Sequence, residues 1–204
     1  AASDVYKRQV PGQKARQNTI TVLTRIWAQP TPELLGLHGR AVALFHHGEL
    51  VDRLGLHWAM MIGTYPFFAD IASAIGRLGA LQGEVALAQV TRRVVADWGE
   101  RSTLVRATRR LIRSMVSWGV LRDTATRGIY ALAPARREVP NALALLMLEA
   151  VLIDSEQDSL PLQQVTGHPA LFPFKVGVGP VQIRNATQFQ VHREGMDLDL
   201  VGIV

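Results

Sequence analysis

Four arginines in the middle of the chain are spaced so that their charged groups can act together. Arg106, Arg109, Arg110 and Arg113 stand at positions i, i+3, i+4 and i+7, and such positions share one side of an α-helix. Like charges this close repel one another unless an anion lies across them. Guanidinium groups bind phosphate oxygens through paired hydrogen bonds. The spacing therefore predicts an exposed stripe, with no carboxylate beside it, that binds a polyanion.

Residues on either side of the stripe extend it. Arg101 and Ser102 stand at the helix start, where Ser102 is expected to be the N-cap and the free backbone N–H groups can hold a phosphate. Arg122 and Arg127 lie on or beside a hairpin that follows the helix. The predicted contact residues are Arg101, Ser102, Arg106, Arg109, Arg110, Arg113, Arg122, Thr126 and Arg127.

The elements that must position these residues can be predicted from periodicity and glycine placement. A short strand at 84–86 leads into the helix LAQVTRRVVADWG, which ends at Gly99. The arginine helix, STLVRATRRLIRSMVSWGVL, runs from Thr103 to about Trp118. Two apolar runs around the turn 124–128 then predict a hairpin, VLRDTATRGIYAL, with which the short strand could pair.

With the helix before it, this stretch resembles the winged helix-turn-helix superfamily. The resemblance covers residues 64–134 and rests on the two helix sequences and the hairpin quoted above. It implies that the arginine helix enters the major groove of double-stranded DNA and that the hairpin, or wing, touches the DNA backbone or minor groove. Some winged helices bind protein instead, so the fold alone leaves the function open.

The charge distribution favours a local polyanion surface. The net charge is +5, and residues 84–137 alone hold eleven basic and four acidic groups. Residues 1–83 sum to +3 and residues 138–204 to −5. A basic centre beside an acidic tail has two interpretations. The arginines bind an external polyanion, or Asp197 and Asp199 of the tail cover Arg109 and Arg113.

The chain is expected to be mainly α, of the α+β class, in four parts. Residues 1–9 resemble a translated sequencing-adapter segment and are treated as non-native. Residues 10–63 form a helical N-terminal segment, residues 64–137 the winged-helix domain, and residues 138–204 a helix followed by a small antiparallel β region. The strands of that region are expected behind the wing, at 181–183, 189–192 and 197–201.

Composition excludes several classes of protein and site. The chain has no cysteine, which rules out disulfides and thiolate metal sites and fits a reducing cytoplasm. The longest apolar run, residues 142–153, is too short to span a membrane and contains Glu149. It is interpreted as a buried helix, and no membrane partner is expected.

No catalytic centre is predicted. The sequence has no glycine-rich phosphate-binding motif and no nucleophile elbow. His46 and His47 are adjacent and cannot easily face one metal ion, and the acidic residues near Asp197 and Asp199 lack a lysine at nuclease spacing. We expect a non-enzymatic protein without metal or cofactor.

Two other functions remain open. The order of N-terminal helices, winged helix and acidic tail is similar to bacterial phage-defence accessory proteins of the bacteriophage exclusion type, which implies a scaffolding subunit with a protein partner. An effector-sensing transcription regulator would need a pocket among Trp58, Met60, Met61, Tyr65 and Phe68. Winged-helix regulators are commonly homodimers, but no dimer seam is evident in the sequence.

Overall fold

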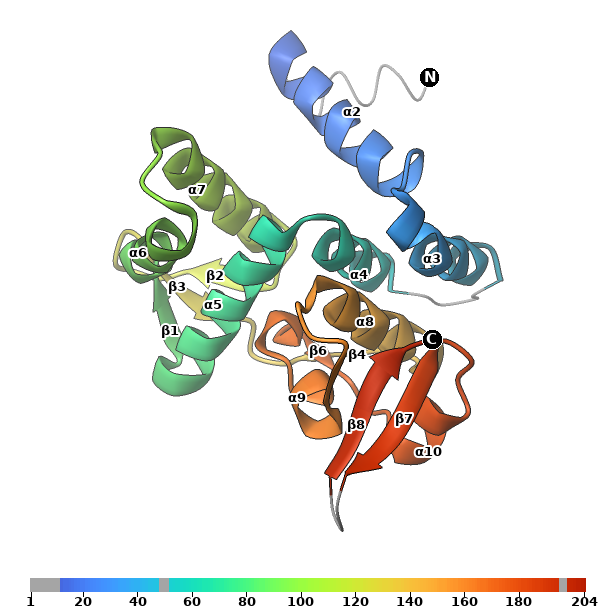
Figure 1. Ribbon diagram of the computed structural model, residues 1–204. Coiled ribbons are helices and arrows are strands. Elements are labelled where there is room, and N and C mark those ends of the chain that lie inside the picture. The colour runs from blue at the N-terminus through green and yellow to red at the C-terminus, as the bar shows by residue number, and fades with distance from the viewer. Residues whose placement is uncertain (1–11, 48–51, 195–197) are drawn as a thin grey trace.

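The computed structural model describes residues 12–47, 52–194 and 198–204 and shows a mixed α+β fold (Figure 1). The adapter-like residues 1–9 lie outside the described part of the chain. The helices are α2 (Gln13–Trp27), η1 (Pro32–Leu34), α3 (Leu35–His47), α4 (Arg53–Thr64), α5 (Pro66–Gln82), α6 (Leu87–Trp98), α7 (Ser102–Ser117), α8 (Asn141–Asp154), α9 (Leu162–Thr166), η2 (Pro169–Leu171) and α10 (Pro180–Arg184).

The described strands form three small sheets. In two of them the strands are antiparallel, in the orders β1-β3-β2 and β5-β8-β7, and in the third β4 pairs parallel to β6. The strands are β1 (Glu84–Ala86), β2 (Leu121–Asp123), β3 (Ile129–Leu132), β4 (Arg137–Glu138), β5 (Ser159–Pro161), β6 (Phe174–Lys175), β7 (Phe189–Glu194) and β8 (Leu198–Ile203).

The basic centre of the sequence folds into α6, α7 and the sheet β1-β3-β2. The predicted pairing of residues 84–86 with the hairpin is confirmed, because Val85 of β1 stands opposite Tyr130 of β3. Three glycines at the ends of helices and in the hairpin turn have positive φ, which glycine adopts at little cost: Gly99 (80°), Gly119 (74°) and Gly128 (81°).

One prediction about α7 is wrong. Ser102 is not the N-cap but the first helical residue, and the cap position belongs to Arg101, in extended conformation with no side-chain cap hydrogen bond. The cap shifts because the carbonyl of Arg101 already accepts from the backbone N–H groups of Leu104 and Val105. The start of α7 therefore has no side-chain oxygen on its first N–H groups.

The aromatic centre of the core is Trp58 on α4, which is fully buried. Its indole N–H donates to the carbonyl of Ala170 over 2.9 Å. Four other aromatic rings meet it edge to face, at centroid distances of 5.0 to 6.2 Å: Phe68, Trp118, Phe172 and Phe174. The end of α7, the start of α5 and the chain around η2 therefore meet at one side chain.

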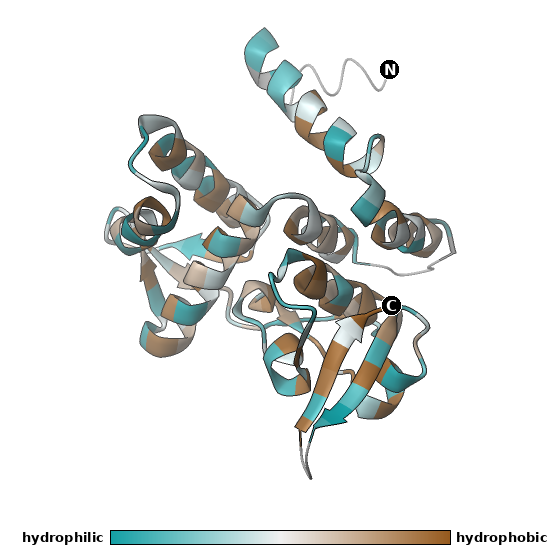
Figure 2. Cartoon of the chain, viewed as in Figure 1, coloured by the Kyte–Doolittle hydropathy of each residue, from teal (hydrophilic) through white to brown (hydrophobic). Residues whose placement is uncertain are grey.

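Helix α8 is the apolar run that the sequence predicts as a buried helix, and this prediction is confirmed. It is brown along most of its length in Figure 2 and almost entirely buried. Its one buried charge, Glu149, is 1% exposed and accepts a 2.7 Å hydrogen bond from Nε of Arg40 on α3. Within the described residues no helix has the length and apolar content needed to cross a bilayer.

The small antiparallel β region near the C-terminus exists, but one of its expected strands is a helix. Residues 181–183 belong to α10, because Pro180 suits the first helical position and the side chain of Gln182 accepts a 3.1 Å hydrogen bond from the N–H of Gly179. The other two expected strands are β7 and β8, although Asp197 lies outside the described residues. Their sheet packs against α8 and α9 and not behind the hairpin (Figure 1).

The close approach of α5 to η2 generates a first prediction. A methyl group at Gly76 would overlap the carbonyl oxygen of Pro169, which is backbone and cannot move aside. We expect Gly76→Ala to lower the free energy of unfolding by about 2 kcal/mol. Gly39→Ala is the matched control, because no atom lies within 4 Å of its added methyl, and it should stabilise α3 by about 0.5–1 kcal/mol. Urea denaturation measures the free energy of unfolding of both variants. Equal changes in the two variants would contradict the packing argument.

Asp154 at the end of α8 generates a second prediction. Burial, and secondarily the charge of Asp70, raise its pKa from 3.8 to about 7. A raised carboxyl pKa means that the folded state loses stability as pH rises from about 4 to 7. We expect Asp154→Asn to be more stable than the native chain at pH 8 by about 1–2 kcal/mol, allowing for solvent screening, and no more stable at pH 4. Thermal unfolding against pH tests this, with exposed Asp158→Asn as control.

Candidate nucleic-acid interface

Helix α7 separates its apolar and basic sides as predicted. Thr108, Ile112 and Met115 are buried against the rest of the protein, and the hydroxyl of Thr108 is satisfied by the carbonyl of Leu104 at 2.9 Å. The arginine side is open to solvent. All nine predicted contact residues are exposed: Arg101, Ser102, Arg106, Arg109, Arg110, Arg113, Arg122, Thr126 and Arg127.

The expectation that no carboxylate lies beside the stripe is wrong at one position. Asp123 of β2 forms a 2.6 Å ion pair with Arg113, and this carboxylate raises the arginine's pKa. The pairing depends on where β2 lies against the last turns of α7, which spacing within the helix does not reveal. Both side chains are more than half exposed, so the pair restrains Arg113 without removing it from solvent.

The turn between β2 and β3 is ordered by its own side chains. The hydroxyl of Thr124 accepts from the N–H of Thr126 at 3.2 Å and lies 3.0 Å from the carbonyl of Ile129, to which it can donate. The carbonyl of Gly128 accepts from the N–H of Leu87 at 2.8 Å, which ties the turn to the start of α6. Arg127 is therefore held beside α6 on a fixed turn.

A shallow hollow of about 620 Å³ lies where α6, α7 and this turn meet. Arg92, Arg109 and Arg127 line it, one from each element, together with Val105 and Leu87, and no carboxylate is among its described lining residues. Arg109 and Arg127 are among the contact residues predicted from the sequence, but Arg92 is not. The sequence feature that could have indicated Arg92 is the predicted pairing of residues 84–86 with the hairpin. That pairing brings the hairpin turn to the start of α6, the helix that carries Arg92.

The acidic tail does not neutralise this surface within the described residues. Asp199 pairs with Arg184 at 2.9 Å, Glu138 pairs with Lys175 at 2.8 Å, and Glu149 pairs with Arg40. No described carboxylate of residues 138–204 forms an ion pair with α7. Asp197, the other expected cover for the arginines, lies outside the described residues. The intramolecular interpretation therefore gains no support from Asp199.

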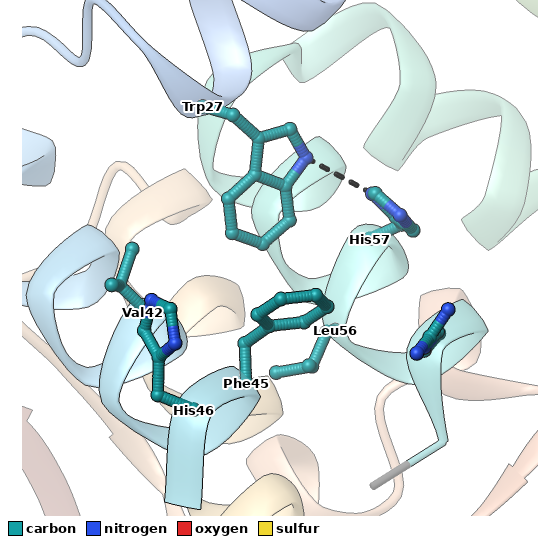
Figure 3. A pocket seen from close by; sticks show the side chains of 7 residues that line it. Trp27, Val42, Phe45, His46, Leu56 and His57 are labelled. Atoms are coloured by element: carbon teal, nitrogen blue, oxygen red, sulfur yellow. Dashed lines mark hydrogen bonds between the residues drawn. The ribbon is translucent and has the colours of Figure 1, made fainter. Parts of the chain in front are cut away.

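The side chains suggested for an effector pocket are core residues. Trp58, Met60 and Phe68 are each 2% exposed or less, and Met61 and Tyr65 are partly buried and packed against the same core. A largely apolar pocket of about 370 Å³ lies instead between α2, α3 and α4. In Figure 3 its lining rings Trp27 and Phe45 face one another, and the indole N–H of Trp27 donates to Nδ1 of His57 over 3.0 Å.

The histidines are spread among other contacts. His38 lies with Nε2 2.9 Å from the carbonyl of Trp27, and His57 accepts from the same tryptophan. In the described chain no three histidine, aspartate or glutamate side chains are grouped as a metal site would require.

Compared with known proteins, the chain matches no protein-family model, no curated protein and no solved structure.

Proposed function

We propose that residues 64–137 are a winged helix that binds double-stranded DNA through α7 and the β2–β3 hairpin. The observation that carries the proposal is the hollow in which Arg92, Arg109 and Arg127 converge from three elements without a described carboxylate. A polyanion lying along α7 would contact all three.

The order of elements supports the winged-helix part of the proposal. Helix α5 is followed by strand β1, helices α6 and α7, and a hairpin, and the sheet has the order β1-β3-β2. The apolar side of α7 packs inward and the arginine side faces out beside the hairpin, which is how a recognition helix and wing are presented to a duplex. Figure 1 shows this unit on the opposite side of the molecule from β7 and β8.

The electrostatics support the DNA part. Within the described residues, Arg101 and six other arginines of this surface form no ion pair; the six are Arg92, Arg106, Arg109, Arg110, Arg122 and Arg127. If each neutralises one phosphate, the slope of log affinity against log salt is about −5. Arg101 and Ser102, at the uncapped start of α7, add N–H groups suited to a phosphate.

Two arginines of the hollow give the third prediction. Arg109→Ala/Arg127→Ala should weaken binding to a mixed-sequence duplex and reduce the salt slope by about 2. The matched control is Arg25→Ala/Arg53→Ala, which removes the same charge from exposed positions elsewhere and should change the slope little. Fluorescence anisotropy between 50 and 200 mM salt measures both variants. An equal loss of duplex affinity in the two variants would mean that only the net charge of the protein matters. Absence of duplex binding by the native chain would rule out the DNA proposal.

The Arg113–Asp123 pair gives the fourth prediction. Asp123→Asn removes the competing carboxylate and frees the guanidinium for phosphate. Duplex affinity at low salt should rise about threefold to tenfold, and the salt slope should steepen by about 1. The same substitution in an Arg113→Ala background should have a much smaller effect. A gain that persists without Arg113 would show that the pair is not the cause.

A protein-binding role is the second candidate function, and exposed apolar side chains favour it. Ile20, Leu23, Leu35 and Phe45 are 42–58% exposed on α2 and α3, and α2 projects from the body of the molecule in Figures 1 and 2. Such side chains suit a partner subunit or a second copy. If the native chain binds no duplex at low salt, sedimentation of Phe45→Ser against the native chain is the measurement to make.

A further inference from the structure

The other side of α6 carries a second basic hollow, distinct from the proposed DNA surface. Arg92 and its neighbour Arg93 diverge: Arg92 lines the hollow beside α7, whereas Arg93 lines a cleft of about 530 Å³ beside α5. That cleft lies between α5, α6, η2 and β6. Its volume is in the range of sites that hold small molecules.

The cleft collects positive charge from three separate parts of the chain. Arg77 comes from α5, Arg93 from α6, and Arg136 from the segment that joins β3 to β4. None of the three forms an ion pair within the described residues, and no described lining residue is acidic. Lys175 lies at the same cleft, but Glu138 pairs with it at 2.8 Å.

A histidine and several apolar side chains also line the cleft. Nδ1 of His168 is buried with no hydrogen-bond partner in the described structure, and burial, followed by the charge of Arg77, lowers the pKa of this histidine. Leu78 and Phe172 form part of the wall. Leu81 is 83% exposed at the same cleft, unusually open for a leucine. The cleft thus offers cations for an anion and carbon surface for an apolar body.

We propose that this cleft binds a phosphate monoester with a planar or apolar body, of the size of a nucleoside monophosphate. Three guanidinium groups match a dianionic phosphate better than a single carboxylate, because each can donate two hydrogen bonds to its oxygens. A duplex is too wide to enter a cleft of this volume, whereas a mononucleotide fits. The site does not depend on the DNA proposal, because different arginines carry it.

Calorimetric titration of the full chain with AMP tests this proposal, with adenosine and inorganic phosphate as comparison ligands. AMP should bind, and both comparison ligands should bind at least tenfold more weakly, because each lacks one half of the contacts. Arg93→Gln and Arg136→Gln should each weaken AMP binding at least tenfold. Arg92→Gln is the control: it removes the adjacent charge on the same helix and should leave AMP affinity unchanged.

Four outcomes would overturn the proposal. The first two are that AMP does not bind and that inorganic phosphate binds as tightly as AMP. The third is that Arg92→Gln and Arg93→Gln lose AMP affinity equally. The fourth is that Arg136→Gln loses duplex binding and keeps AMP binding. The last would assign the cleft to nucleic-acid phosphates. Arg136 lies on an exposed connecting segment, so its variant keeps the test valid if Arg93→Gln fails to fold. AMP binding that survives in Arg109→Ala/Arg127→Ala would separate this site from the proposed DNA surface.

Discussion

The burial of Trp58 joins elements from separate parts of the chain. This side chain lies on α4, yet it meets Trp118 just after α7, Phe68 at the start of α5, and Phe172 and Phe174 beside η2. An indole that large is stable in a core only if its N–H is bonded, and Ala170 provides the acceptor. Both basic hollows are therefore bordered by elements fixed at the same aromatic centre.

Helix α6 divides the positive charge of the protein between two surfaces. Its inner residues Val90 and Val94 are buried, and the neighbouring arginines 92 and 93, about 100° apart around the helix axis, line different hollows. One side faces α7 and the hairpin, and the other faces α5 and η2. Asp199, one of the tail residues expected to cover the arginines of α7, pairs instead with Arg184. Residues 84–137 carry a net charge of +7, and within the described residues only Arg113 and Arg137 of their arginines form ion pairs.

Local sequence patterns predicted the elements well where one strong signal decides the conformation. The burial pattern of α7, the buried helix α8 and the pairing of β1 with the hairpin follow from periodicity, an apolar run and short strand signals. The predictions are wrong where the conformation or the partner of a residue depends on a contact between distant residues or on a single helix cap. Asp123 reaches Arg113 only because of how β2 lies on α7, and residues 181–183 are helical because Gln182 caps Gly179. The convergence of Arg77, Arg93 and Arg136 involves positions up to 59 residues apart, which no local pattern contains.

Apart from the pair of Arg113 with Asp123, the arginine stripe does not stabilise α7. Neighbouring cations three and four residues apart repel one another in the free protein, and Arg106, Arg109 and Arg110 have no described ion pair to offset that repulsion. Burial of Ile112 and Met115 on the opposite side is what holds the helix in place. Because Arg106, Arg109 and Arg110 are exposed and unpaired within the described residues, we expect their replacement by alanine to remove repulsion and leave the core unchanged. A loss of anion binding in such variants therefore reports on the surface and not on the fold.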